Sequence, residues 1–252
     1  MDDSQLEAAV AALADRDYRA AGDAYSRAGW QRLADPREGL SPFEADEKGW
    51  VGRALAALCA GTVAYRVAGA DRRATLRAVE GNALARDLGE SLDAPGQAAC
   101  LAEMAADFRV AGGLDGASEA YDRAVAAYEE AGADIDQPQA LGTTPLFEAA
   151  AATVKQVARS TANGEIAVTW EDLHGADPAD AGPFLAHRAS YKSRRFPSLV
   201  AAVCEEGYLA APRGTTEYNN AQFRCPACDS TDVNWVHDAT LCMRCSTPVE
   251  RA

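Results

Sequence analysis

Four cysteines near the end of the chain have the residue type and spacing of a metal site. Two residues separate Cys225 from Cys228 and Cys242 from Cys245, and thirteen residues lie between the two pairs. Two intervening residues allow one tight turn to direct both thiolates at one ion, and two such turns supply the four sulfurs of a tetrahedral Zn²⁺ shell. Because four thiolates fill that shell, we expect a structural zinc ion with no open position for a substrate.

The segment between the two cysteine pairs indicates how they are brought together. Val233–Val236 and Ala239–Leu241 alternate as two strands around His237 and Asp238. With the cysteines, this pattern resembles the zinc-ribbon family over residues 224–250. A redox dithiol is the alternative interpretation, and the presence of two closely spaced pairs disfavours it. The resemblance implies a small metal-dependent fold that binds either protein or nucleic acid.

Little else in the chain points to catalysis. No Gly-rich phosphate loop ending in Lys-Ser/Thr, no Gly-x-Ser-x-Gly and no His-Glu-x-x-His occurs. His174 lies near Asp172, Asp177 and Asp180, which fits either an acid–base or metal site or, as we favour, a solvated polar loop. We therefore expect no enzyme, and a catalytic site hidden near His174 is the third-ranked hypothesis.

A basic cluster stands out in an acidic chain. The net charge is -14, yet residues 184–224 carry six basic and three acidic side chains. The basic residues are Arg188, Lys192, Arg194, Arg195, Arg213 and Arg224. They predict phosphate contacts with nucleic acid, with Tyr191, Phe196 and Tyr218 available for stacking on bases. Docking of this stretch against acidic helices of the same chain is an equally weighted alternative.

The amino-acid composition indicates the cellular setting of the protein. Lys48, Lys155 and Lys192 are the only lysines, and the alanine-rich, arginine-preferring, acidic composition resembles haloarchaeal cytoplasmic proteins. In such proteins acidity keeps the surface hydrated, so it does not indicate a cationic ligand. The N-terminus has no signal-peptide pattern, and the longest uncharged apolar stretch, 54–65, is shorter than the roughly 20 residues of a membrane helix. We expect a cytoplasmic protein without a membrane segment.

Residues 1–162 follow a helical pattern with an internal repeat. Three-, four- and three-residue steps connect Tyr18, Ala21, Tyr25 and Ala28, and again Leu114, Ala117, Tyr121 and Ala124. Leu101, Met104, Ala105 and Phe108 supply the face of a preceding helix, and a weaker copy runs from Leu58 to Gly81. This pattern resembles tetratricopeptide-like arrays of the SNAP-adaptor type over residues 1–135. An alanine-rich helical bundle without a repeat is the alternative.

Turn signals divide the helical region. They fall at Asp35-Pro36, at Pro42, in 93–96 and in 136–138. A last helix is predicted over Pro145–Ser160, with Thr143 and Thr144 as capping residues and Asn163-Gly164 as its stop signal. We place the domain boundary at 162–164.

The middle segment, 165–223, forms a small basic α+β module in this interpretation. A helix is expected from Phe196 to Gly207, followed by a hairpin of 210–214 with 216–223. A helix that is followed by a hairpin resembles the end of a winged-helix domain. The predicted fold is thus mainly α: a helical array (1–162), an α+β module (165–223) and a zinc ribbon (224–250).

The functional expectation follows from these parts. We expect a non-enzymatic adaptor that binds a protein partner through the helical array, with a structural Zn²⁺ in the ribbon. The alternative is a regulator that binds nucleic acid through the basic cluster and the ribbon. The sequence does not assign an oligomeric state.

Overall fold

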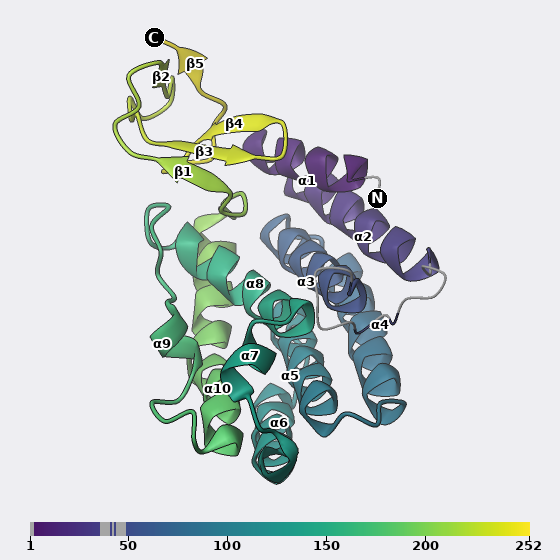
Figure 1. The fold of residues 1–252 in the computed structure, drawn as a ribbon. Coiled ribbons are helices and arrows are strands. Elements are labelled where there is room, and N and C mark those ends of the chain that lie inside the picture. The colour runs from purple at the N-terminus through teal and green to yellow at the C-terminus, as the bar shows by residue number, and fades with distance from the viewer. Residues whose placement is uncertain (1–2, 36–40, 42, 44–48) are drawn as a thin grey trace.

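The computed structural model describes residues 3–35, 41, 43 and 49–252. The predicted turn signals at Pro36 and Pro42 lie outside the described residues. In the described part of the chain, helices make up most of the body and short strands gather at its C-terminal end (Figure 1). No helix in these ranges is long and apolar enough to cross a lipid bilayer.

The N-terminal part is a series of helices, each of which packs against the next one along the chain (Figure 1). They are α1 (Ser4–Ala14), α2 (Tyr18–Ala34), α3 (Val51–Val67), α4 (Asp71–Glu90), α5 (Pro95–Gly112) and α6 (Ala117–Ala131). The aromatic and small residues of the repeat pattern lie in the core: Tyr18, Ala21, Tyr25 and Ala28 on α2 and Tyr121 and Ala124 on α6 are buried.

Later helices cover one side of this series. After the 3₁₀ turn η1 (Gly132–Asp134) come α7 (Pro138–Gly142), α8 (Pro145–Ser160), α9 (Trp170–Leu173) and α10 (Ala181–Glu206). Both α8 and α10 pack against α3 and α5, and α10 also packs against α6. The faces of α3 and α5 that an open helical array would offer to a partner are therefore occupied by the chain's own helices.

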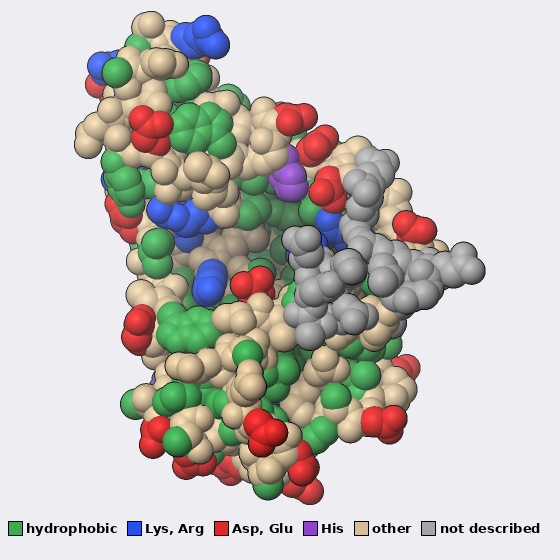
Figure 2. Space-filling view, viewed as in Figure 1, with side chains coloured by type: hydrophobic (Ala, Val, Ile, Leu, Met, Phe, Trp, Pro, Cys, Tyr) green, Lys and Arg blue, Asp and Glu red, His purple; other side chains and the backbone are tan. Residues whose placement is uncertain are grey.

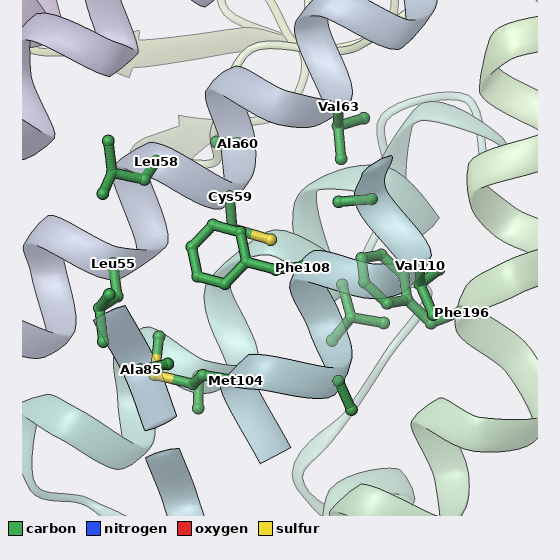
Figure 3. Packing of buried hydrophobic residues seen from close by; sticks show 14 of the residues in the cluster. Leu55, Leu58, Cys59, Ala60, Val63, Ala85, Met104, Phe108, Val110 and Phe196 are labelled. Atoms are coloured by element: carbon green, nitrogen blue, oxygen red, sulfur yellow. The ribbon is translucent and has the colours of Figure 1, made fainter. Parts of the chain in front are cut away.

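The sequences of α3 and α5 account for their central position. Both helices are apolar or small on nearly all sides, and a helix of that kind is stable only when it is surrounded. In Figure 3, side chains from α3, α4, α5 and α10 point into one core, with Phe108 near its centre. Cys59 and Cys100 are buried in this core, as expected for small apolar residues, and Cys204 is half-buried.

The predicted boundary at 162–164 does not separate two cores. The bounds of α8 match the predicted helix, and Asn163 and Gly164 adopt positive φ after it. In contrast, α10 begins well before the predicted start at Phe196, and Pro197 lies inside it. Interior proline disfavours a helix, but Phe196 is fully buried in the common core, so tertiary packing overrides the local signal.

The C-terminal strands form two small sheets. They are β1 (Thr215–Glu217), β2 (Phe223–Arg224), β3 (Val233–Val236), β4 (Ala239–Cys242) and β5 (Glu250–Arg251). The predicted hairpin of β3 with β4 is confirmed, with Val236 opposite Ala239 across the turn. The predicted hairpin of 210–214 with 216–223 is wrong. Instead β1 pairs antiparallel with β3 and β2 with β5, so these residues extend the ribbon and do not form a wing.

A buried ion cluster attaches α10 to α5. Arg188 of α10 donates two hydrogen bonds to Glu103 of α5, from Nε to Oε1 at 2.7 Å and from Nη2 to Oε2 at 2.8 Å. Arg188 also donates to the Tyr128 hydroxyl at 3.0 Å and to the Phe147 carbonyl at 3.1 Å. Bidentate pairing with further hydrogen bonds is the geometry in which a buried charge pair is tolerated.

One helical turn further on, the pairing is repeated. Lys192 Nζ lies 2.6 Å from both Glu103 Oε1 and Asp107 Oδ2, and it donates to the Ala150 carbonyl at 2.5 Å. The Tyr121 hydroxyl donates to Asp107 Oδ1 at 2.6 Å. Two carboxylates thus meet two cations, and the buried cluster is neutral overall.

The cluster shifts the pKa values of its carboxyl groups in opposite directions. Burial opposes ionisation of Glu103, but Arg188 and Lys192 outweigh it and lower its pKa to about 2. Ionised Glu103 therefore stabilises the folded state fully above the ordinary pKa of a glutamate, and this stabilisation is lost as the pH falls through about 2. Burial outweighs Lys192 at Asp107 and raises its pKa to about 6, which still leaves this carboxyl ionised at neutral pH.

Small residues allow the helices of the series to approach closely. A Cβ at Gly81 of α4 would lie 2.3 Å from the Phe108 ring, whereas a Cβ at Gly89 of the same helix would meet Leu101 at an ordinary 3.5 Å. Gly81 therefore provides the space into which Phe108 packs.

Replacing Lys192 with Met should destabilise the fold by about 3–5 kcal/mol, because Asp107 would then be a buried and uncompensated charge. Urea unfolding measures the change. Arg195→Met, an exposed change on the same helix, should cost less than about 0.5 kcal/mol. Equal effects of the two substitutions would contradict the role of the cluster, and Lys192→Met with Asp107→Asn should recover part of the loss.

Gly81→Ala should destabilise the protein by about 1–3 kcal/mol, because the added methyl group overlaps the Phe108 ring. Gly89→Ala should be neutral or stabilising by up to about 1 kcal/mol, since alanine favours the helix and the site has room. Thermal unfolding of both variants tests the pair. Stabilisation by Gly81→Ala would show that the close crossing of α4 and α5 is wrong.

Candidate metal centre

Two turns with the same hydrogen bonds hold the cysteine pairs. In the first knuckle, which we define as Cys225–Asp229, the Asp229 amide donates to the Cys225 carbonyl at 3.0 Å and the Cys225 amide to the Ser230 carbonyl at 2.9 Å. Asp229 has a φ of 63°, which turns the chain sharply after Cys228. Both thiols of the pair are thereby directed to one side of the turn.

The second knuckle, Cys242–Ser246, repeats this arrangement. The Ser246 amide donates to the Cys242 carbonyl at 3.0 Å, the Cys242 amide donates to the Thr247 carbonyl at 2.8 Å, and Ser246 has a φ of 58°. The Arg244 amide also points to the Cys242 sulfur, at 3.4 Å. Because β3 and β4 form one hairpin, the second knuckle is carried to a position opposite the first.

The four sulfurs lie at distances that fit a zinc ion. All lie within 4.8 Å of one another. Sulfur–sulfur distances are 3.5 Å for Cys225–Cys245 and 3.6 Å for both Cys228–Cys242 and Cys228–Cys245. A regular tetrahedron with Zn–S bonds of about 2.3 Å requires about 3.8 Å between sulfurs. The cysteine cluster therefore fits a bound Zn²⁺, and the four thiolates would complete its shell.

Arg159, at the end of α8, anchors the second knuckle to the helices. Its guanidinium is buried and donates to the carbonyls of Met243 at 2.8 Å and of Ala211, while its Nε donates to the Gly164 carbonyl at 2.9 Å. A Cβ at Gly164 would lie 1.9 Å from the Met243 carbonyl oxygen, so only glycine fits there. This contact explains the Asn163-Gly164 turn better than a helix stop alone.

Further contacts hold the ribbon in place. The buried Ser246 hydroxyl accepts the Ala211 amide at 2.9 Å and lies 3.2 Å from the Tyr208 hydroxyl. Arg244 pairs with Asp232 at 2.6 Å and with Glu165, which precedes the ribbon in the chain. A small apolar cluster, formed by Val10, Ala211, Val236 and Leu241, joins α1 to the β3–β4 hairpin.

Each knuckle has one buried and one more accessible cysteine. Cys225 and Cys242 are buried, whereas Cys228 is exposed and Cys245 is half-buried. One side of the metal centre is therefore part of the protein interior, and the other faces solvent at the end of the molecule (Figure 1).

The residues predicted to contact nucleic acid do not form one surface. Arg188 and Lys192 are buried in the ion cluster, so their prediction as phosphate contacts is wrong and the alternative of docking against acidic helices holds for them. The others divide between separate elements. Arg194 and Arg195 are exposed on α10, Arg213 is half-buried and donates to Thr216, and Arg224 pairs with Asp229 in the first knuckle.

His174 does not lie in a solvated loop, which corrects that expectation. It is buried, stacks on Trp170 with ring centroids 3.6 Å apart, and its Nδ1 lies 3.0 Å from the Trp170 carbonyl. Burial lowers its pKa, so the ring is neutral at neutral pH. Asp172 is engaged in a capping box with Thr169. His174 is thus a packed aromatic residue of the α9 segment.

Sequence reasoning missed the residues that attach the ribbon. Arg159 and Ser246 carry no motif, and nothing local distinguishes them from surface residues. For the ion cluster a signal did exist. Glu103 and Asp107 are four positions apart within an otherwise apolar helix, and Arg188 and Lys192 have the same spacing, which predicts two charged pairs facing each other.

The protein should bind one Zn²⁺ per chain, measured by native mass spectrometry. Cys242→Ser should abolish binding, while Cys204→Ser, at a half-buried cysteine outside the cluster, should not. Because metal binding supplies roughly 10 kcal/mol to such small folds, a chelator should remove hydrogen-exchange protection from β3 and β4 but leave most of the helical signal. Protected ribbon amides in metal-free protein would contradict this expectation.

Comparison with known proteins gives no family for this chain. No family model matches it, and neither the curated proteins nor the solved structures give a match. The cysteine cluster and the surfaces around it are therefore the features of this chain that bear on its function.

Proposed function

We propose that this protein is a non-enzymatic adaptor in which a helical array binds a protein partner and a zinc ribbon has a structural role. The observation that carries the proposal is the anchoring of the second knuckle by Arg159 and Ser246. A closed four-thiolate centre offers no position for substrate. Its zinc would fix the shape of one end of the helical body, which is the property an adaptor surface needs.

The arrangement of the helices supports a tetratricopeptide-like interpretation. Each helix from α1 to α6 packs against its neighbour in the chain, and glycines at crossings admit aromatic rings, as Gly22 does for Tyr65. Because α8 and α10 cover the inner helices, the partner would bind at a groove of the outer surface and not along the inner face of the array.

Nucleic-acid binding is the second candidate, and the geometry favours it less. Two of the six predicted contact residues are buried, and Arg224 is paired with Asp229. The exposed Arg194 and Arg195 remain as a candidate contact. Phosphate binding draws its affinity from several clustered cations, which a single pair does not supply.

The setting that we propose is a reducing, salt-rich cytoplasm of the haloarchaeal kind. The net charge of -14 keeps such a protein hydrated at high salt. Free cysteines in the core and four thiols at metal distance suit a compartment that keeps thiols reduced. At high ionic strength the Debye length falls to a few ångströms, which favours shape and apolar contacts over long-range attraction.

Affinity purification of the tagged full-length protein from native lysate tests the adaptor role. Mass spectrometry should show a stoichiometric protein partner that resists nuclease, because protein contacts do not depend on nucleic acid. The double variant Arg194→Glu/Arg195→Glu should retain that partner. Nuclease-sensitive DNA or RNA without a stable protein, lost in this variant, would reverse the ranking of the two functions.

A further inference from the structure

A groove runs between α8 and the chain segments that lead into the ribbon. It consists of two adjacent hollows of about 340 and 320 Å³, which share Ala152, Gln156 and Pro212 as lining residues. The first lies against the 165–168 segment, and the second lies among α1, α2, α3 and α8. Figure 2 shows Lys and Arg side chains around a hollow between the C-terminal lobe and the helices.

The groove gathers cations that have no carboxylate partner among the described residues. Lys155 and Arg53 line it and make no hydrogen bond or ion pair with any described residue. Lys155 is exposed at the groove, and partial burial lowers the pKa of its ammonium, with Glu148 acting against the shift. In the described part of the chain, the Arg213 guanidinium hydrogen-bonds to two neutral groups, the Thr216 hydroxyl and the Met243 sulfur.

The two acidic side chains of the groove offset only part of this positive charge. Glu165 is engaged outside the groove by Arg244 and by the Tyr218 hydroxyl at 2.8 Å. Glu148 is exposed and makes no ion pair within the described ranges. The lining is thus locally basic in a protein whose net charge is -14, and the groove is complementary to an anionic group.

The remaining lining is apolar. Ile166 is 60% exposed beside Lys155, and Ala152, Val168 and Pro212 continue the surface. A large aliphatic side chain exposed at the edge of a concave surface is a feature of binding sites. A surface with few cations and an apolar floor suits a ligand that has carboxylates next to apolar side chains. It suits a run of phosphates less well, because such a run requires many clustered cations.

We propose that this groove, lined by Arg53, Lys155, Ile166 and Arg213, binds an acidic–apolar segment of a partner protein. The carboxylates of the segment pair with Lys155, Arg213 and Arg53, and its apolar side chains cover Ile166. This inference rests on the proposed adaptor function and names the surface and the partner chemistry for it.

The zinc centre supports one wall of the groove. Pro212 and Arg213 follow Ala211, whose amide is bound by Ser246 of the second knuckle, and Glu165 is held by Arg244 of the same knuckle. The groove therefore keeps its shape only while the second knuckle is folded. Loss of the metal should weaken partner binding even though no partner atom contacts the metal.

Fluorescence anisotropy with the full-length, zinc-loaded protein tests the proposal. The probe is a fluorescein-labelled peptide in which Asp and Glu alternate with Leu and Phe, and a peptide with Asn and Gln in place of the acids is the reference. The acidic peptide should bind, and Lys155→Glu should weaken it about tenfold or more, as expected for a lost charge-assisted contact. Ile166→Ser and removal of zinc by a chelator should also weaken it.

Arg123→Glu is the matched control. Arg123 is exposed on α6 and lines a different groove, and its substitution makes the same change of charge. It should alter the affinity by less than about twofold, because net charge alone has a small effect at a distance. Equal losses for Lys155→Glu and Arg123→Glu, or equal binding of the amide peptide, would overturn the proposal.

Two further outcomes separate this proposal from the adaptor function. A protein partner captured equally well by wild type and by Lys155→Glu would leave the adaptor function intact and overturn the groove assignment. Single-stranded RNA that binds wild type but not Lys155→Glu, without any binding of the acidic peptide, would assign the groove to nucleic acid and overturn both. Circular dichroism and zinc content of each variant confirm that it is folded.

Discussion

Burial of charge constrains this fold more than any other interaction. Glu103 and Asp107 lie on α5, a helix that is covered on nearly all sides, and an unpaired carboxylate there would cost several kcal/mol. Arg188 and Lys192 on α10 have the same four-residue spacing and meet them directly. Because a shift of α10 by one turn would leave charges unpaired, the cluster defines how α10 is aligned on α5.

The alignment of α10 on α5 determines how the later helices and the C-terminal strands are placed. With α10 and α8 packed on α3 and α5, these two helices are covered by described parts of the chain, and the end of α8 is brought to the second knuckle. There Arg159 satisfies backbone carbonyls from both the connecting segments and the second knuckle. The cysteine cluster and the groove beside α8 are consequently parts of one structural unit, in which a metal ion bound by the cysteines would support a surface that it does not touch.

Local features of this protein could be predicted from sequence alone. The cysteine spacing, the β3–β4 hairpin and the bounds of α8 depend on residues close together in the chain, where turn geometry, thiolate chemistry and helical periodicity act directly. The mainly helical fold and the metal-compatible cysteine cluster follow from the same short-range rules.

Only the tertiary structure determined where the basic residues lie and how the middle segment folds. The sequence left Arg188 and Lys192 equally open to phosphate contact and to docking against acidic helices, and in the structure each meets a carboxylate 85 positions away. β1 pairs antiparallel with β3, and beside this pair the Gly214 amide donates to the Asn234 side chain, 20 positions away. The sequence by itself determined which side chains can bind metal and which segments are helical. The matching four-residue spacings within Glu103–Asp107 and Arg188–Lys192 are a local signal for these pairs, but whether a charged residue faces solvent or a buried partner depends on long-range packing.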